Sequence, residues 1–363
     1  MRWPLAPILP LAAALLGWQL AGEAALAAAD QSGLEVLSYT PSAMELGGNT
    51  YVMVRGMLRN GGSFGVGTVT VSLTLWGDDP ASPLGLGSGQ GFLDRLAPGE
   101  EGPFTVAVRH CCLEDARRFD FALSAPEQRE RPYRALETRH VASRQGRQGP
   151  ERTGELFNAG DLSVNAPSLD LYAAYWRGAD LVALHAANLP VLWSLGGAVG
   201  QALPPGLAYP FVLAEPAEPF DRVAYFVNGT PYPAGSYPVP LGWGGLDGRQ
   251  DGADLVWRGI LRNCGREPTN AAIVILDWRA AERQVRGFAR WDLDLGLPLA
   301  PGAGRWIALR LGDAPPALLE PGAVSFLPLA LAVQDQAPPA YLCSVSPWRL
   351  TLPLLGLPQE PTP

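Results

Sequence analysis

The chain has 363 residues, of which 47% are hydrophobic, and this is enough to form several independent cores. Glycine and proline contribute 42 and 36 residues without a collagen period, which favours turn-rich β structure over disorder. The formal charge of −8 argues against nucleic-acid binding, and the absence of lysine excludes lysine nucleophiles and Schiff bases.

Residues 1–29 have the pattern of an export signal. Arg2 is followed by an uncharged apolar stretch, and Ala27-Ala28-Ala29 offers a small-x-small cleavage site. Three prolines in the stretch disfavour a membrane-spanning helix. We therefore expect an extracellular or cell-envelope protein with no stable membrane span after signal cleavage. The alternative left open is a signal that is retained as an anchor.

The pattern Gly-x-Leu-x-Asn-x-Gly, followed later by Leu-x-Pro-Gly, occurs three times in the chain. The copies contain Asn60, Asn158 and Asn263, and they begin at residues 56, 154 and 259, which gives periods of 98 and 105 residues. Such periods match a small β-sandwich. From the asparagine to the turn proline, the first and third copies have the same spacing, and the second is nine residues longer. The repeat predicts tandem sandwiches, of which the second is divergent.

Alternating apolar residues predict antiparallel strands in the first copy. Valine and leucine alternate with threonine and serine over residues 68–75, as in a half-buried strand. Asn60 to Gly62 can end the preceding strand, since both residue types tolerate the left-handed conformation. Gly56 indicates a bulge or a close approach of another segment. Ala97-Pro98-Gly99 suits a type II turn.

The other two copies follow the same order of apolar segments. These segments are residues 169–171, 210–213 and 223–227 in the second copy, and 273–276, 306–311 and 324–326 in the third. Ile273 to Leu276 is apolar on both faces, so we expect a neighbouring domain or the C-terminal segment to cover its outer face. No segment has a sustained helical period, so helices should be minor.

These patterns predict an all-β fold of three tandem immunoglobulin-like antiparallel β-sandwich domains. The predicted organisation is a signal peptide at 1–29, sandwiches at 33–126, 133–229 (divergent) and 238–353, and a flexible tail at 354–363.

The repeat resembles the FxLYD domain, an immunoglobulin-like module of bacterial and archaeal surface or secreted proteins. The resemblance lies in the segment from Val54 to Gly62, in Val71 to Trp76, and in Leu96 to Glu100 before Pro103-Phe104. The motif that names the family is absent as written, and Leu75 to Asp78 is its nearest relative in this chain. The resemblance implies a sandwich fold and carries no catalytic residues.

Four cysteines in an exported protein suggest disulfide pairing. Cys264 follows the asparagine of the third copy and Cys343 lies beyond its last core strand, so this pair is a candidate disulfide that straps the C-terminal segment. A bond between the adjacent Cys111 and Cys112 would need a strained ring, and free thiols or an intermolecular bridge are the alternatives. No metal site is expected beside them, because neighbouring side chains of a strand point in different directions.

Asp247, Asp251 and Asp254 lie among glycines in a pattern similar to a calcium loop. Arg249 occupies a position where such loops supply an oxygen ligand, so a hairpin turn is the favoured explanation. Calcium binding is kept as the alternative.

Trp176, Trp193 and Trp243 fall in or near predicted loops and are candidate ligand-contact aromatics. The competing interpretation is that they are buried core residues, as tryptophans of sandwiches commonly are.

The sequence contains no Gly-x-Ser-x-Gly, His-Glu-x-x-His or phosphate-binding glycine loop, so no catalytic, cofactor-binding or metal residue is predicted. We expect a non-enzymatic spacer or protein-interaction module whose partner is an unidentified protein or an envelope glycan. The alternative is a carbohydrate- or peptide-binding protein that uses loops of the second domain, and a more remote one is a hydrolase.

Overall fold

The computed structural model describes most of the chain after residue 32. The described residues are 33–110, 113–128, 130–146, 149–189, 202–233, 235, 237–279, 285–312, 314, 316–319, 324–334 and 350–351. They form antiparallel sheets and three short 3₁₀ helices and contain no α-helix, which confirms the predicted all-β class. The chain divides into two compact units between Pro132 and Tyr133. The predicted signal peptide and tail lie outside the described residues.

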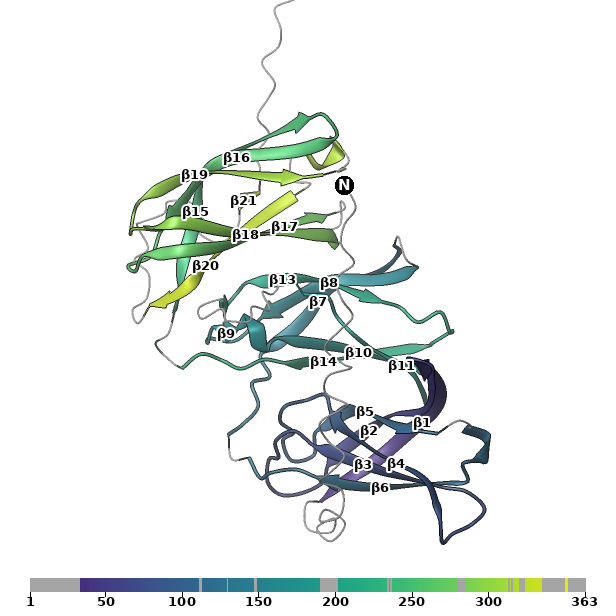
Figure 1. The fold of residues 1–363 in the computed structure, drawn as a ribbon. Coiled ribbons are helices and arrows are strands. Elements are labelled where there is room, and N and C mark those ends of the chain that lie inside the picture. Colours follow the sequence, from purple (N-terminus) through teal and green to yellow (C-terminus); the bar gives the residue numbers. More distant parts are fainter. Residues whose placement is uncertain are drawn as a thin grey trace, which may run out of the picture. The chain divides into compact units, whose positions relative to one another are not determined.

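The first unit is built from one six-stranded sheet (Figure 1). Its elements are β1 (Leu34–Leu46), β2 (Asn49–Asn60), β3 (Thr70–Trp76), β4 (Pro83–Gly91), β5 (Glu101–Arg109), η1 (Leu113–Asp115) and β6 (Arg118–Ser124). The strand order is β1-β2-β5-β4-β3-β6. Val71, Leu73 and Leu75 of β3 are all buried, so the predicted alternation is confirmed.

The second unit begins with two three-stranded sheets, β13-β8-β7 and β11-β10-β14, and one two-stranded sheet, β12-β9. The elements are β7 (Leu136–Gln145), β8 (Pro150–Asn158), β9 (Val164–Asn165), η2 (Ala166–Ser168), β10 (Asp170–Arg177), β11 (Asp180–Ala186), β12 (Ala202–Leu203), β13 (Ala208–Ala214) and β14 (Arg222–Asn228).

The rest of the second unit is one seven-stranded sheet of order β18-β17-β20-β15-β16-β19, with β21 added to β20. The elements are β15 (Tyr237–Asp251), β16 (Asp254–Asn263), β17 (Thr269–Arg279), β18 (Val285–Leu299), β19 (Gly304–Leu311), η3 (Pro316–Leu319), β20 (Val324–Gln334) and β21 (Leu350–Thr351).

The three copies of the repeat use one cyclic order of six strands. The six strands of each copy are numbered one to six in chain order, with the short strands β9, β12 and β21 left out. The cycle is then 1-2-5-4-3-6. The first copy is open between the sixth and first strands and the third copy between the fifth and fourth. The second copy lacks a ladder at both places and has one isolated bridge, between Asn188 and Val212, at the second of them. The sheets of the three copies therefore differ in where the hydrogen-bonded ladder is interrupted, and not in which strands are neighbours.

Aromatic side chains bridge the open edges in the first and third copies. The ring of Tyr39 on β1 lies 5.4 Å from that of Phe119 and 4.9 Å from that of Phe121 on β6. In the third copy Trp291 of β18 donates its indole N–H to the carbonyl of Arg310 on β19, at 3.0 Å. Such contacts cover edge strands that would otherwise offer unpaired backbone groups.

The asparagine of the repeat is a buried clamp between the end of one strand and the Leu-x-Pro-Gly turn. Asn60 is fully buried, and its amide nitrogen donates to the carbonyls of Phe64 at 2.8 Å and Leu96 at 3.0 Å. Its amide oxygen accepts from the N–H of Gly62 at 3.0 Å. The side chain thus satisfies three backbone groups that lie in two separate segments.

Asn158 and Asn263 make the same three bonds in the second and third copies. The partners are the carbonyls of Leu162 and Leu203 and the N–H of Gly160 for Asn158, and the carbonyls of Glu267 and Leu299 and the N–H of Gly265 for Asn263, all at 2.8–3.1 Å. Both asparagines are at most 1% exposed, like Asn60. The repeat therefore encodes one hydrogen-bonded corner three times.

The left-handed interpretation of the asparagine turn is wrong. Among the described residues, His140 is the only non-glycine residue with a positive φ, and Gly62 is not among the glycines that have one. The asparagine is required for its amide and not for its backbone conformation. The type II turn is confirmed, because Gly99 has φ +78° and the N–H of Glu100 donates to the carbonyl of Ala97 at 3.0 Å.

A β-bulge lies within two residue pairs of the first glycine of each copy, in the neighbouring strand. The register shifts between Val36 and Ser38 in β1, between Arg139 and Ala142 in β7, and between Trp243 and Leu246 in β15. Each of these strands pairs with the strand that carries the motif.

The motif glycines leave room for these bulges and for an aromatic ring. A Cβ at Gly56 would lie 2.4 Å from the carbonyl oxygen of Ser38, and one at Gly259 would lie 2.2 Å from that of Gly245. At Gly154 the nearest atom is the Cζ of Phe211, at 2.6 Å. Of the two alternatives expected at Gly56, the close approach of another segment is therefore confirmed, and the bulge lies in the neighbouring strand β1.

We predict that Asn60→Ala destabilises the first unit by about 2–4 kcal/mol, because three buried backbone groups lose their partner. Asn60→Asp should cost at least as much, since a carboxylate cannot donate to the two carbonyls. Hydrogen–deuterium exchange of β2 and β5 amides in the full chain measures the change. Asn49→Ala, at a partly exposed site, is the control, and equal protection in all variants would contradict the clamp.

We predict that Gly56→Ala destabilises the first unit by about 2 kcal/mol or more, because the new methyl group overlaps a backbone carbonyl. Gly91→Ala is the matched control, since its Cβ would meet its nearest atom at 3.6 Å, an ordinary contact. Urea unfolding of the full chain should resolve the two variants. Similar midpoints for both would show that β1 can move away at no cost.

Candidate functional site

The second copy contains a polar cluster where its two sheets separate. Arg152 of β8 donates from Nε to Oε1 of Glu215 at 2.8 Å, and Ser143 of β7 donates to the same oxygen at 2.6 Å. The Glu215 side chain is 8% exposed and that of Arg152 18% exposed. The carboxylate is thus held by two donors in a largely desolvated place.

Tyrosines connect this cluster to the other sheet. Arg152 donates from Nη1 to the hydroxyl of Tyr225 on β14 at 3.1 Å. Tyr175 of β10 is fully buried, donates to the carbonyl of Ala214 at 3.3 Å, and packs edge-on against Phe220 at 4.9 Å. Burial raises the pKa of Tyr175 far above its usual value of about 10.

The donors and acceptors of the cluster are directed at one another. Ser143 donates to Glu215, and the imidazole of His185 points its Nδ1 at the carbonyl of Ala214, the residue before Glu215, at 2.6 Å. A serine nucleophile would need a base beside its hydroxyl, and here the hydroxyl is held by a carboxylate that an arginine already pairs with. The arrangement joins the two sheets across the gap where they lack a ladder.

A second polar pair lies in the bulge of β7. His140 has φ +51°, and its Nδ1 lies 2.7 Å from Oε2 of Glu155 on β8. Glu155, whose side chain is 6% exposed, stands where the first copy has Met57 and the third Ile260. The left-handed conformation is unfavourable for a histidine, and the contact with the buried carboxylate offsets this cost.

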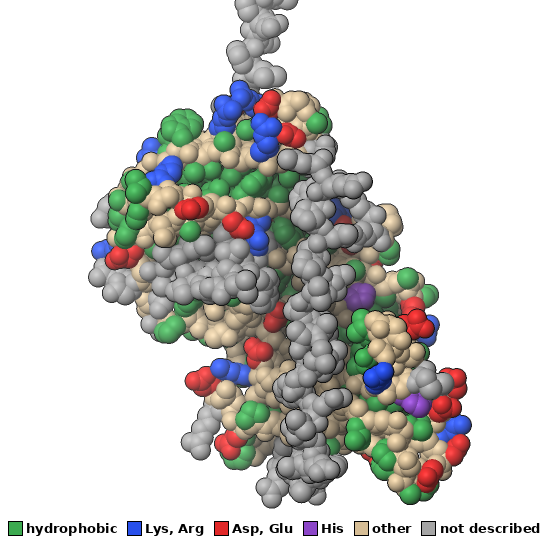
Figure 2. Space-filling model, in the orientation of Figure 1, with side chains coloured by type: hydrophobic (Ala, Val, Ile, Leu, Met, Phe, Trp, Pro, Cys, Tyr) green, Lys and Arg blue, Asp and Glu red, His purple; other side chains and the backbone are tan. Residues whose placement is uncertain are grey.

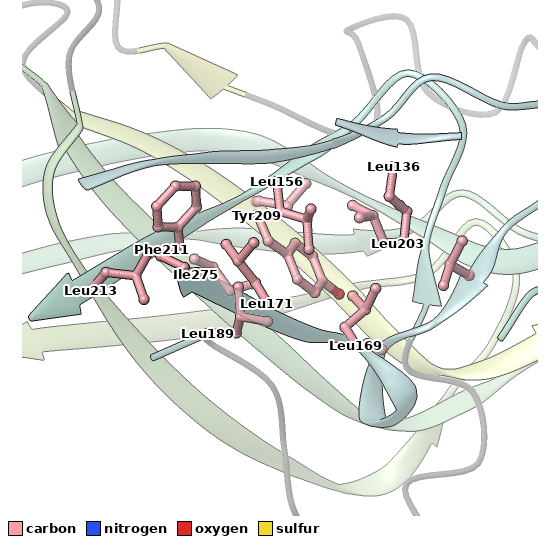
Figure 3. Packing of buried hydrophobic residues seen from close by; sticks show 14 of the residues in the cluster. Leu136, Leu156, Leu169, Leu171, Leu189, Leu203, Tyr209, Phe211, Leu213 and Ile275 are labelled. Carbon is pink, nitrogen blue, oxygen red and sulfur yellow. The ribbon is translucent and has the colours of Figure 1, made fainter. Parts of the chain in front are cut away.

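The second and third copies share a buried apolar joint. Ile275 of β17 belongs to the same cluster of buried side chains as Tyr209 and Phe211 of β13 (Figure 3). Leu327 and Leu329 of β20 are members of this cluster as well. The neighbours of Ile275 in sequence, at positions 274 and 276, point into the core of the third copy. The expectation that a neighbouring domain covers the outer face of this segment is confirmed at Ile275.

A hydrogen bond accompanies the joint. The hydroxyl of Thr153 on β8 donates to the carbonyl of Val285 on β18 at 2.5 Å, and both residues are buried. Together with the apolar cluster, this contact makes the second and third copies parts of one compact unit.

Two of the three candidate ligand-contact tryptophans lie in strands and are buried, so the competing interpretation that they are core residues is confirmed for them. Trp176 is 4% exposed in β10, under the guanidinium of Arg222 at 4.1 Å. Trp243 is 7% exposed in β15 and packs against Phe326 at 6.3 Å. Neither indole is available to an external ligand, because large aromatic side chains fill the interior of the sandwich. Trp193 lies outside the described residues.

The aspartates around Gly252 form a tight hairpin. Asp251 and Asp254 are cross-strand partners, Gly252 has φ +65°, and both carboxylates pair with Arg310 of β19 at 2.8 and 2.7 Å. Asp247 lies further along β15, opposite Arg258. No group of three or more metal-ligand side chains occurs in the described part of the chain. The hairpin interpretation is confirmed, and two of the three carboxylates have an arginine partner.

Cys264 is 2% exposed and disulfide-bonded. Its predicted partner Cys343, and Cys111 and Cys112, lie outside the described residues, so the pairing of Cys264 with Cys343 stays a prediction.

Sequence reasoning missed an exposed aromatic residue, Trp306 of β19, which is 72% exposed. The signal was present in the segment 306–311, where Ile307, Leu309 and Leu311 alternate inward and Trp306 is out of phase with them. Treating the segment as one apolar run concealed this.

In the part of the chain that the structure describes, no helix is long and apolar enough to cross a membrane. No family model matches the chain, and a comparison with curated proteins gives no match. Among solved structures, the crystal structure of a DUF4785 family protein from Legionella pneumophila aligns with 85% of this chain and 94% of its own length. The identity is 8% and the TM-score 0.16, values that carry no argument about function.

We predict that the second unit loses stability as the pH rises above about 10, because the unfolded chain releases the Tyr175 proton there and the folded protein does so only at higher pH. The contribution of this group is fully present below that pH. Tyr175→Phe should flatten the dependence, and Tyr237→Phe, at a site 36% exposed, should not. Denaturant midpoints between about pH 8 and 11 test this, and parallel curves for all three proteins would contradict it.

Proposed function

We propose that the protein is a non-enzymatic spacer or interaction module of the cell envelope or the extracellular space. The observation that carries the proposal is the apolar joint between the second and third copies. Its members Ile275, Leu327 and Leu329 are at most 4% exposed. An apolar joint of this kind opposes bending between sandwiches, whereas domains joined only by a linker move independently.

The distribution of polar groups supports the same function. The side-chain amides of the three motif asparagines are buried and form hydrogen bonds with backbone groups. These residues are Asn60, Asn158 and Asn263. In the cluster around Arg152, the donors and acceptors form hydrogen bonds with one another and join two sheets. These side chains strengthen the scaffold, and a rigid scaffold presents its surface to a partner protein or an envelope glycan at a fixed spacing.

The test is the rigidity of the second unit in solution. Spin labels on genetically encoded residues at Ala179 and Ala253, two exposed turn positions on either side of the joint, avoid the native cysteines. We expect a single narrow distance distribution, because the joint holds the two copies together. Ile275→Asp should broaden it, since a charge at this site must be hydrated.

Leu297→Asp is the matched control, because Leu297 is 74% exposed on β18 and its change leaves the joint intact. Circular dichroism verifies that each variant keeps its strands. A broad distribution in the unaltered protein would contradict the spacer function.

A further inference from the structure

The outer face of β16 and β19 carries an isolated tryptophan. Trp306 is 72% exposed, and its cross-strand neighbour is Ile260. The residues before and after it on the same face of β19 are Gly304 and Ala308, which are too small to cover an indole. The ring is therefore an open, flat apolar surface.

Two arginines stand on either side of this ring. In the register of β16 and β19, Arg262 is opposite Gly304 and Arg258 is opposite Ala308, so both are diagonal neighbours of Trp306. Both are exposed, and among the described residues neither forms an ion pair or a side-chain hydrogen bond. Four positions apart on one strand, they lie about 13 Å from each other along it.

Other charged residues on this face lie close to residues of opposite charge. Arg310 is paired with Asp251 and Asp254. Asp247 is the cross-strand neighbour of Arg258 without forming an ion pair with it. Elsewhere, charged side chains of both signs lie side by side on the visible face of the molecule (Figure 2). The two arginines beside Trp306 therefore offer positive charge that an external anion can neutralise.

One of these arginines, Arg262, lies against the β15 bulge. A Cβ at Gly244 would lie 2.6 Å from Nε of Arg262, so the side chain crosses the backbone of the bulge. Gly304 likewise leaves room for Ile260, whose Cγ2 would be 2.6 Å from a Cβ there. Glycines on both neighbouring strands thus make space for the residues that surround the indole.

We propose that Trp306, Arg258 and Arg262 bind a uronate-bearing polysaccharide. The C–H face of one sugar ring stacks on the indole, and carboxylates on the units before and after it pair with the two arginines. A protein partner would be expected to enclose the tryptophan in an apolar pocket, whereas the surroundings here are small or charged. The proposal is independent of the spacer function, because it concerns only the outer face of one sheet.

Calorimetric titration of the full chain with an oligomannuronate hexamer tests the site. We expect Trp306→Ala to weaken binding by about tenfold or more, and Arg258→Gln with Arg262→Gln to do the same. Trp306→Phe should retain part of the affinity, and added salt should weaken binding to the unaltered protein because the arginines are exposed. Trp306 is mostly exposed, so its substitution leaves the fold intact.

The matched controls are Leu297→Ala, another exposed apolar residue, and Arg177→Gln, an exposed arginine of β10, and both should bind like the unaltered protein. The neutral cellohexaose should bind more weakly than the uronate. Absence of uronate binding, or binding that Trp306→Ala does not change, would overturn the proposal. So would polyglutamate binding as tightly as the hexamer, because that result would assign the face to acidic polypeptides.

Discussion

The structure depends on a buried asparagine that joins the end of one strand to a turn 36 or more residues later. A strand end and a turn both leave backbone groups without ladder partners, and when these groups are buried they must be satisfied locally. The amide of Asn60 meets two carbonyls and one N–H at once. Asparagine suits this role, because it offers two donors and an acceptor without a charge. Its recurrence at Asn158 and Asn263 gives the three copies the same corner.

The first glycine of the motif acts with this corner. The bulge in the preceding strand brings a carbonyl or a side chain against the position of Gly56, Gly154 or Gly259, where a Cβ has no space. In the third copy the bulge contains Gly245 at φ +86°, and in the second His140 takes the left-handed conformation. In the second copy, a histidine with an unfavourable backbone conformation is therefore accompanied by a contact with a buried carboxylate. The third copy has a glycine in the bulge, which adopts this conformation without strain.

Differences between the copies concern how each closes and what it contacts. The first and third copies keep a single sheet and bring an aromatic residue to the open edge, whereas the second copy has two three-stranded sheets that Arg152 and its partners join. The surface that the second copy shares with the third is apolar at Ile275 and Leu329. An apolar contact of this kind restricts movement between two sandwiches, and this is the physical basis of the proposed spacer function.

The sequence by itself determined the strands, the type II turns and the repeat. These features depend on residues that are close in the chain: the alternation of apolar residues in a strand, and a proline followed by a glycine in the turn, as at Pro98 and Gly99. It also indicated the outer face of Ile275 as a covered surface. Only the tertiary structure decided the role of the asparagine, since its two carbonyl partners are far apart in the chain. It likewise buried Trp176 and Trp243 and exposed Trp306, because the face of a strand that turns inward depends on register and on the neighbouring sheet. Local pattern gives a strand its period, and packing between distant segments gives each side chain its environment.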